Sequence, residues 1–344
     1  MRRDSALAIV ALAAVGAAVV ISSSARLDAH PTTDVTWNRD VARILQDHCA
    51  VCHHGGGAVS LDLTDYAQAR RWAHAIARNV LERRMPPWRA APGFGDFAND
   101  RSLSTYEIDV ITAWVNGGTR IGPPLPPQRA VRDHDPFDAT VELGGTAAPV
   151  AGAVRALVLP ASDRERWISG WEFRPGDASV VKDASISIGD MVIGTWSPGE
   201  PATVLPDGTG YRIPAATTVR ARIRYRDVEP RVMDTTRVAL RLSPRPLHEI
   251  AQLRVRPGAR VLVTAMDVLA VRPRVGASGT SVQIIARHRD GSIEPLLVID
   301  RGDAEAAVTY RCRRPVRLES GTVVKLLAFD RSSRATLDYV ATAR

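Results

Sequence analysis

The chain has 344 residues, of which 45% are hydrophobic and 24% charged, and its formal net charge is +8. This composition excludes a mainly disordered chain, and the length predicts two or three globular domains. Three cysteines are too few for a disulfide-stabilised scaffold, and a single long apolar run excludes a polytopic membrane protein.

The positive charge does not indicate a nucleic-acid partner. Only Lys182 and Lys325 are lysines, and the arginines that make up the other basic residues are scattered along the chain. A nucleic-acid-binding surface would cluster them. We therefore attribute the arginine content to codon bias in a GC-rich genome and expect no nucleic-acid binding.

Residues 1–29 are predicted to be a signal peptide or an N-terminal anchor. Arg2 and Arg3 precede an apolar run over residues 6–21, and small residues follow it. The run is slightly long for a signal peptide and short for a membrane-spanning helix, so cleavage and membrane anchoring through residues 6–21 both stay open. In both cases we expect an exported, periplasmic protein.

The segment from Cys49 to His53 is a C-x-x-C-H motif, which in an exported protein indicates covalent haem attachment. Cys49 and Cys52 would each form a thioether with the haem, and His53 would be the proximal iron ligand. A thioredoxin-like redox pair does not require the histidine. A zinc site would need a second ligand pair, and Cys312 is too distant in sequence to supply one.

Three helices are predicted around this motif. Asn38 is expected to cap a short helix that runs into Cys49, and Asp65 to begin a second helix, which ends before Met85-Pro86. Ser104 and Glu107 form a capping-box pattern for a third helix. We expect His48, His54 and His74 to be solvated surface residues.

This order of elements, with Met-Pro-Pro-Trp at 85–88 and Asn-Asp-Arg-Ser-Leu-Ser at 99–104, resembles class I c-type cytochromes. More narrowly, it resembles bacterial proteins in which such a domain precedes a copper monooxygenase-like module. The resemblance covers residues 35–122 and predicts a cytochrome c domain over residues 34–122. It implies one covalent haem c, held by Cys49, Cys52 and His53, with Met85 as the distal iron ligand.

A proline-rich linker is predicted over residues 123–136, and the pattern beyond it changes from helical to alternating. Apolar residues from Val219 to Tyr225 alternate with arginines, which we interpret as a solvated face, and Asp290-Gly291 indicates a hairpin turn. We predict β-sandwiches over residues 137–244 and 245–344. The expected fold class is therefore multidomain α plus all-β, a small all-α cytochrome c domain followed by two antiparallel, jelly-roll-like sandwiches.

The β-half resembles the peptidylglycine-hydroxylating type of copper monooxygenase, through the segments 171–176, 193–199, 207–225 and 290–330. The resemblance places copper-binding histidines where this chain has Lys182-Asp183, Arg224 and Arg274. The last methionine is Met266, so no later one can act as the thioether ligand. Arginine cannot lose its proton in a protein and cannot ligate a cation. We therefore expect no copper.

From the sequence we expect an exported monohaem cytochrome that transfers one electron at a time to an unknown periplasmic redox partner. The copper-free β-module would serve in docking or ligand binding. The charged residues at the copper positions of the resembled family either pair with one another and form a pocket that could accept an anion, or they form a solvated surface patch. Two alternatives stay open. One is a copper- and ascorbate-dependent monooxygenase fed by the haem domain, and the other is a sensor or assembly module with a structural haem.

Overall fold

The computed structural model describes residues 35–55, 59, 61–124, 141–148, 150–227 and 233–342. The predicted signal or anchor segment 1–29, with its apolar run 6–21, lies outside the described residues, and so do positions 125–136 of the predicted linker. In the part of the chain that the structure describes, no helix is long and apolar enough to cross a membrane.

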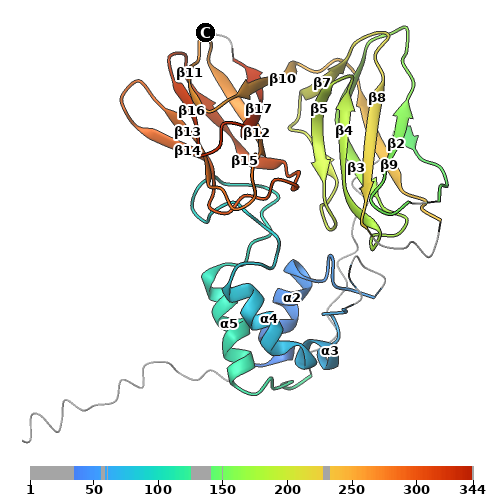
Figure 1. The fold of residues 1–344 in the computed structure, drawn as a ribbon, viewed down its shortest axis with the longest axis vertical. Coiled ribbons are helices and arrows are strands. Elements are labelled where there is room, and N and C mark those ends of the chain that lie inside the picture. The colour runs from blue at the N-terminus through green and yellow to red at the C-terminus, as the bar shows by residue number, and fades with distance from the viewer. Residues whose placement is uncertain are drawn as a thin grey trace, which may run out of the picture.

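The helical elements occupy the N-terminal part of the described chain, at the bottom of Figure 1. They are η1 (Trp37–Val41, a π-helical turn), α2 (Ala42–His48), α3 (Tyr66–Arg71), α4 (Ala73–Leu81) and α5 (Thr105–Asn116). Their apolar faces meet in one core, in which the ring centroids of Trp37 and Trp114 lie 5.8 Å apart.

Two of the three predicted helix starts are confirmed. The Ser104 side chain accepts a hydrogen bond from the backbone N–H of Glu107, and the Glu107 side chain accepts one from the backbone N–H of Ser104, which completes the capping box. Asp65 caps α3 through the backbone N–H of Gln68. The helix expected from Asp65 onwards is divided at Trp72, which links α3 to α4 and is exposed.

The expected Asn38 cap is wrong. Thr36 caps this segment by accepting a hydrogen bond from the backbone N–H of Arg39. The side-chain amide of Asn38 instead donates to the carbonyl oxygens of Gly122 and Pro123, at 3.2 and 3.0 Å. Residues 36–41 therefore hold the far end of the helical region, a contact between distant parts of the chain that local patterning does not show.

Strands make up the rest of the described chain and form three sheets. They are β1 (Val141–Leu143), β2 (Val154–Leu159), β3 (Arg166–Arg174), β4 (Val181–Ile188), β5 (Met191–Trp196), β6 (Thr203–Val204), β7 (Thr209–Ile213), β8 (Val219–Tyr225), β9 (Arg237–Ser243), β10 (His248–Val255), β11 (Gly258–Val261), β12 (Met266–Arg274), β13 (Val282–Arg287), β14 (Ile293–Ile299), β15 (Tyr310–Leu318), β16 (Val323–Ala328) and β17 (Arg334–Ala341).

The strands form two β units that stand side by side above the helices (Figure 1). The first unit, β1 to β9, packs the sheet β2-β8-β4-β5 against strands β1, β9, β3 and β7. The second unit, β10 to β17, packs the sheet β11-β16-β13-β14 against strands β10, β17, β12 and β15. A nine-stranded sheet runs through both units, because β7 pairs with β10 in parallel.

The predicted fold class is wrong. The described part of the chain is mostly β, with 40% of its residues in strands and 14% in helices. The two β units are not separate antiparallel sandwiches, since the parallel β7–β10 pair makes one sheet common to both. Nor are residues 34–122 an independent all-α domain, because the segment after α4 leaves the helices and joins the second β unit through isolated bridges at Ala90–Ile299 and Phe97–Cys312.

Strand β8 shows the predicted alternation of buried apolar residues and arginines. Val219, Ala221 and Ile223 are fully buried in the core of the first unit, as the alternation predicts. The intervening arginines point to the other side of the sheet. Arg220 and Arg222 are exposed there, which confirms the expected solvated face, and together with Arg224 they line the cleft between the two β units. The hairpin turn at Asp290-Gly291, between β13 and β14, is confirmed.

Candidate functional site

The C-x-x-C-H motif forms one tight turn at the end of α2. The backbone N–H groups of Cys52 and His53 both donate to the carbonyl oxygen of Cys49, at 3.0 and 2.9 Å. The turn therefore holds both thiols and the imidazole on one short stretch of backbone. All three cysteines of the chain, Cys312 included, are free thiols.

Burial controls the protonation of the two motif thiols. It raises the pKa of Cys49 to about 12, with a further contribution from neighbouring Cys52. Burial also raises the pKa of Cys52, although the positive charges of Arg101 and Arg226 oppose it. Both thiols are therefore protonated at neutral pH. A nucleophilic redox pair works through a thiolate with a lowered pKa, so this environment does not favour that alternative.

The imidazole of His53 is the best candidate for a metal ligand in the helical region. Burial lowers its pKa, which keeps the ring neutral at pH 7, the form that binds metals. Its Nδ1 atom is buried and has no hydrogen-bond partner. A buried polar atom without a partner is costly. Together with two free thiols in the same turn, this orphaned nitrogen fits a covalently attached haem.

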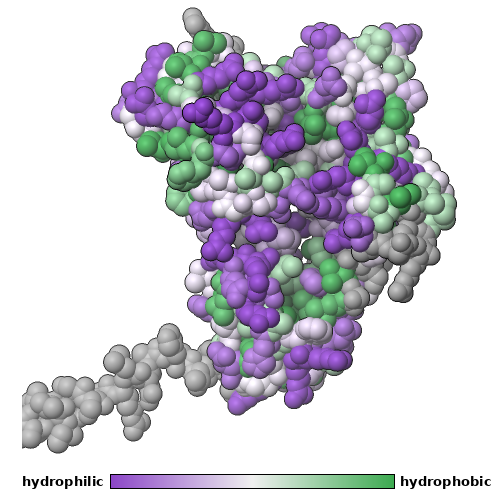
Figure 2. Space-filling view, in the orientation of Figure 1, coloured by the Kyte–Doolittle hydropathy of each residue, from purple (hydrophilic) through white to green (hydrophobic). Residues whose placement is uncertain are grey.

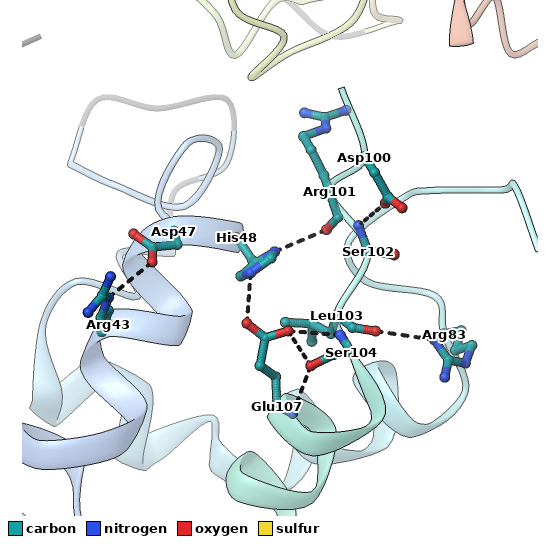
Figure 3. Close-up of polar contacts among 10 residues, drawn as sticks. All are labelled: Arg43, Asp47, His48, Arg83, Asp100, Arg101, Ser102, Leu103, Ser104 and Glu107. Carbon is teal, nitrogen blue, oxygen red and sulfur yellow. Dashed lines mark hydrogen bonds and ion pairs between the residues drawn. The ribbon is translucent and has the colours of Figure 1, made fainter. Parts of the chain in front are cut away.

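His48, directly before the motif, joins α2 to the segment that leads into α5 (Figure 3). One ring nitrogen lies 3.1 Å from Oε1 of Glu107, and the other lies 3.3 Å from the carbonyl oxygen of Arg101. Its predicted role as a solvated residue is therefore wrong, whereas His54 and His74 are exposed as expected. One signal in the sequence could have found this contact, the capping-box glutamate at position 107.

A turn of the first β unit covers the motif. Its residues 197–200 follow β5, and the thiol of Cys52 donates a hydrogen bond to the carbonyl oxygen of Pro198 at 3.2 Å. The guanidinium of Arg101 donates to the same oxygen at 3.0 Å. A Cβ atom added at Gly199 would lie 2.9 Å from a methyl carbon of Val51, so this turn presses directly on the motif.

A buried polar cluster continues from this turn to the second β unit. The side-chain amide of Asn99 donates to Glu200 at 3.1 Å and to the carbonyl oxygen of Thr309 at 2.8 Å, and its oxygen accepts from the backbone of Arg311. Burial raises the pKa of Glu200, against the charges of Arg311 and Arg101. Asn99 and Arg101 belong to the sequence segment that carried the cytochrome resemblance, but their contacts join both β units.

Met85, the predicted distal ligand, is half-exposed and lies just after α4. It lines a cavity of about 30 Å³ together with Val80, Trp88, Leu103 and Ile108, and the three motif residues are not among the side chains that line this cavity. Its assignment as an iron ligand stays a prediction. The segment beyond it is anchored in the second β unit by Trp88, whose ring centroid lies 4.9 Å from that of Tyr310.

Of the residues at the positions where the resemblance expects copper ligands, Lys182, Asp183 and Arg224 form ion pairs and Arg274 does not. The guanidinium of Arg224 donates to the Asp183 carboxylate at 2.7 Å, and Lys182 pairs with Glu305. Arg274 is exposed and lines the cleft between the β units. Among the described residues, no group of three or more His, Cys, Asp and Glu side chains could hold a metal ion.

Comparison of the sequence with known protein families and with curated proteins finds no match. Among solved structures, the chain is similar to the major capsid protein P2 from bacteriophage PM2, with 11% identity, a TM-score of 0.27, and 59% of this chain and 98% of that chain covered. A structure of Sulfolobus turreted icosahedral virus gives 13% identity, a TM-score of 0.14 and coverages of 64% and 100%. Vicilin from Capsicum annuum has 10% identity and a TM-score of 0.15, with 56% of this chain and 77% of that chain covered. These TM-scores are too low to carry an argument.

Proposed function

We propose that the chain is an exported haem protein that transfers one electron at a time to a periplasmic partner protein. One haem c would be attached to Cys49 and Cys52, with His53 as the proximal iron ligand and Met85 as the distal ligand. The observation that carries this proposal is the single turn with two free thiols and an imidazole whose buried Nδ1 has no partner. The resemblance to class I c-type cytochromes supports it.

The chain's own residues would have three tasks in this function. The turn from Cys49 to His53, closed by two backbone hydrogen bonds to Cys49, would present two attachment points and one ligand. The apolar core around Trp114 and Ile111 keeps water from the neighbouring face of the site. Met85 would raise the reduction potential as a thioether ligand, and the haem, when bound, supplies the one-electron couple.

Thioether formation would change the contact between the motif and the β-module. The thiol hydrogen of Cys52 is the donor to Pro198, and a thioether has no such hydrogen. The carbonyl oxygen of Pro198 would keep Arg101 as its donor. The β-module would thus adjust to haem attachment without leaving a buried acceptor unpaired. We propose that this module is copper-free and acts in docking or ligand binding.

The test is to produce the full chain in a host that attaches haem c and to measure iron, copper and haem per chain. We expect one iron, one haem that stays bound in denaturing gels, and no copper. Cys49→Ala and Cys52→Ala should each lose one thioether, and His53→Ala should lose the low-spin spectrum. Two copper ions per chain, or a chain without covalent haem, would overturn the proposal.

The role of Met85 as the distal ligand is tested separately, by the absorption spectrum of a haem-loaded variant. Met85→Ala should abolish the sulfur-to-iron charge-transfer band and lower the reduction potential. The matched control is Met233→Ala, since Met233 is similarly exposed and lies in the first β unit. An unchanged band in Met85→Ala would mean that another side chain is the distal ligand, and it would leave the proposed covalent attachment unaffected.

A further inference from the structure

A cleft with a volume of about 640 Å³ lies between the two β units. One wall is the outer face of the sheet β2-β8-β4-β5, and the other is formed by β10, β12 and β17 with the loop 304–308. Figure 2 shows hydrophilic surface on both units where they face each other. The volume of the cleft lies in the range of small-ligand sites.

The first wall carries guanidinium groups that no carboxylate neutralises. On β8, Arg220 and Arg222 stand directly across from Ser187 and Ser185 of β4, so hydroxyl groups lie where carboxylates would be needed for ion pairs. Among the described residues, neither arginine has an ion-pair partner, whereas their neighbour Arg224 is paired with Asp183. Arginine beside serine is a donor arrangement that suits carboxylates and phosphates.

The second wall places like charges against each other. Arg274 of β12 and Arg334 of β17 are direct cross-strand partners, and like charges in such positions are destabilising. Both line the cleft, and Arg254 of β10 lines it as well. In the described part of the chain, none of these three has a carboxylate partner. A bound anion would relieve the repulsion.

The two walls are held in fixed positions. Buried Arg272 pairs with Asp338, which also accepts a hydrogen bond from Tyr211 of the first unit at 2.7 Å. Gln252 of the second unit donates to the carbonyl oxygen of Val192 in the first at 2.6 Å. Contacts that cross between the units keep the donors in place before a ligand arrives, and such preorganisation favours affinity.

The charges of the cleft add up to a strong positive field. Seven arginines line it, against the three carboxylates of Asp183, Asp190 and Glu305. Asp183 neutralises Arg224, and Asp338 neutralises Arg272 from behind the wall. Glu305 pairs with Lys182. In the described part of the chain, five of the seven arginines and the carboxylate of Asp190 therefore have no ion-pair partner. Low-dielectric walls that carry one sign of charge concentrate ions of the opposite sign.

We infer that this cleft binds a small organic polyanion, a compound with two or more carboxylate or phosphate groups, held between Arg222 on β8 and Arg274 on β12. A polycarboxylate and a phosphate ester share this chemistry. A single nucleic-acid strand is a poorer fit, because the residues that line the cleft include no aromatic side chain on which bases could stack. The site is separate from the haem turn and does not depend on the haem.

The experiment is calorimetric titration of the full, haem-loaded chain with citrate and, separately, with pyrophosphate, each against acetate and sodium chloride at the same ionic strength. We expect one ligand per chain. Arg222→Gln and Arg274→Gln should each weaken binding about tenfold, because each removes a charge-assisted hydrogen bond. Binding of only one of the two probes would identify the anionic group and support the site.

Arg287→Gln is the matched control, because Arg287 is an exposed arginine on β13 that does not line the cleft. It should leave the affinity unchanged. A second readout is thermal stability at low salt, which Arg274→Gln should raise by removing the like-charge pair, whereas loss of a structural arginine would lower it. The inference is overturned if neither probe binds beyond the ionic-strength control, if Arg287→Gln weakens binding equally, or if only a DNA oligonucleotide binds.

Discussion

The helical region is joined to the two β units by contacts of opposite character. The segment 86–97 joins the second unit through apolar rings, with Trp88 and Phe97 packed around Tyr310. The motif turn and Arg101 join the first unit through directed hydrogen bonds, which Cys52 and Arg101 both donate to the carbonyl oxygen of Pro198. Apolar burial is non-directional and large, whereas hydrogen bonds depend on each partner being in place.

This difference assigns separate tasks to the two junctions. The apolar junction fixes the segment that follows Met85 and would tolerate small shifts in geometry. The polar junction contacts Cys52 itself, so it would respond to a change in that side chain, such as thioether formation. The predictions below test whether the first junction supplies more of the stability and the second more of the coupling to the motif.

The largest effect is expected from Trp88→Ala in the apolar junction. Trp88 is buried, and truncation of a buried tryptophan costs about 3–5 kcal/mol of unfolding free energy. Chemical denaturation measures it. Trp72→Ala is the control, since Trp72 is 48% exposed at the break between α3 and α4. Equal losses in the two variants would contradict the assigned role of Trp88.

Asn99→Ala is expected to have the next largest effect. It removes three hydrogen bonds and takes the donor from Oε1 of Glu200 and from the carbonyl oxygen of Thr309, which costs about 1–3 kcal/mol. The same denaturation experiment measures the loss, and Asn116→Ala, at the exposed end of α5, is the control. Because Asn99 contacts both β units, a loss as large as that of Trp88→Ala would mean that hydrogen bonds stabilise these junctions as much as apolar packing does.

Gly199→Ala tests the contact between the turn and the motif. The φ angle of Gly199 is +86°, where an alanine costs about 1–2 kcal/mol, and its Cβ would also press on Val51 and Arg101. Gly93→Ala provides a matched control, because Gly93 has a φ of +81° and nothing within 4 Å of an added Cβ. The expected result is a greater loss of stability in Gly199→Ala.

The same pair of variants also reports on coupling. Crowding next to Cys52 should lower the fraction of chains that acquire covalent haem in Gly199→Ala, while Gly93→Ala should match the unmodified chain. Haem-stained gels scaled to total protein give this fraction. If both variants attach haem equally well and lose equal stability, the turn does not act on the motif.

Sequence reasoning predicted the local features of the molecule. The capping box of Ser104 and Glu107, the Asp65 cap and the alternation from Val219 to Tyr225 are confirmed, because each depends on residues a few positions apart. The hairpin turn at Asp290-Gly291 belongs to the same class. These features are specified by backbone geometry and by burial of one face.

The features that sequence reasoning missed are contacts between distant segments. The parallel pairing of β7 with β10, which overturns the two-sandwich prediction, joins strands from different units and has no local signature. The contact of His48 with Glu107 spans 59 positions, and that of Asn99 with Glu200 spans 101. The arginines of β8 were correctly placed on one face, but only the opposite unit makes that face a cleft wall.

The smallest effect is expected from Glu107→Gln, which weakens the link between α5 and His48. Burial raises the pKa of Glu107, but hydrogen bonds from Ser104 and the neighbouring His48 outweigh it, so the pKa lies below its ordinary value of 4.5. The stabilising contribution is therefore complete above about pH 4.5 and is lost as the pH falls through the lowered pKa. We expect a loss of about 0.5–1.5 kcal/mol at neutral pH.

The pH dependence separates this interpretation from a general structural defect. Thermal unfolding measured from neutral pH down to acid should show the unmodified chain converging on Glu107→Gln as the carboxylate becomes protonated. Glu294→Gln, at an exposed position on β14, should run parallel to the unmodified chain over the whole range. A constant difference between Glu107→Gln and the unmodified chain at every pH would mean that the charge of Glu107 does not stabilise the junction.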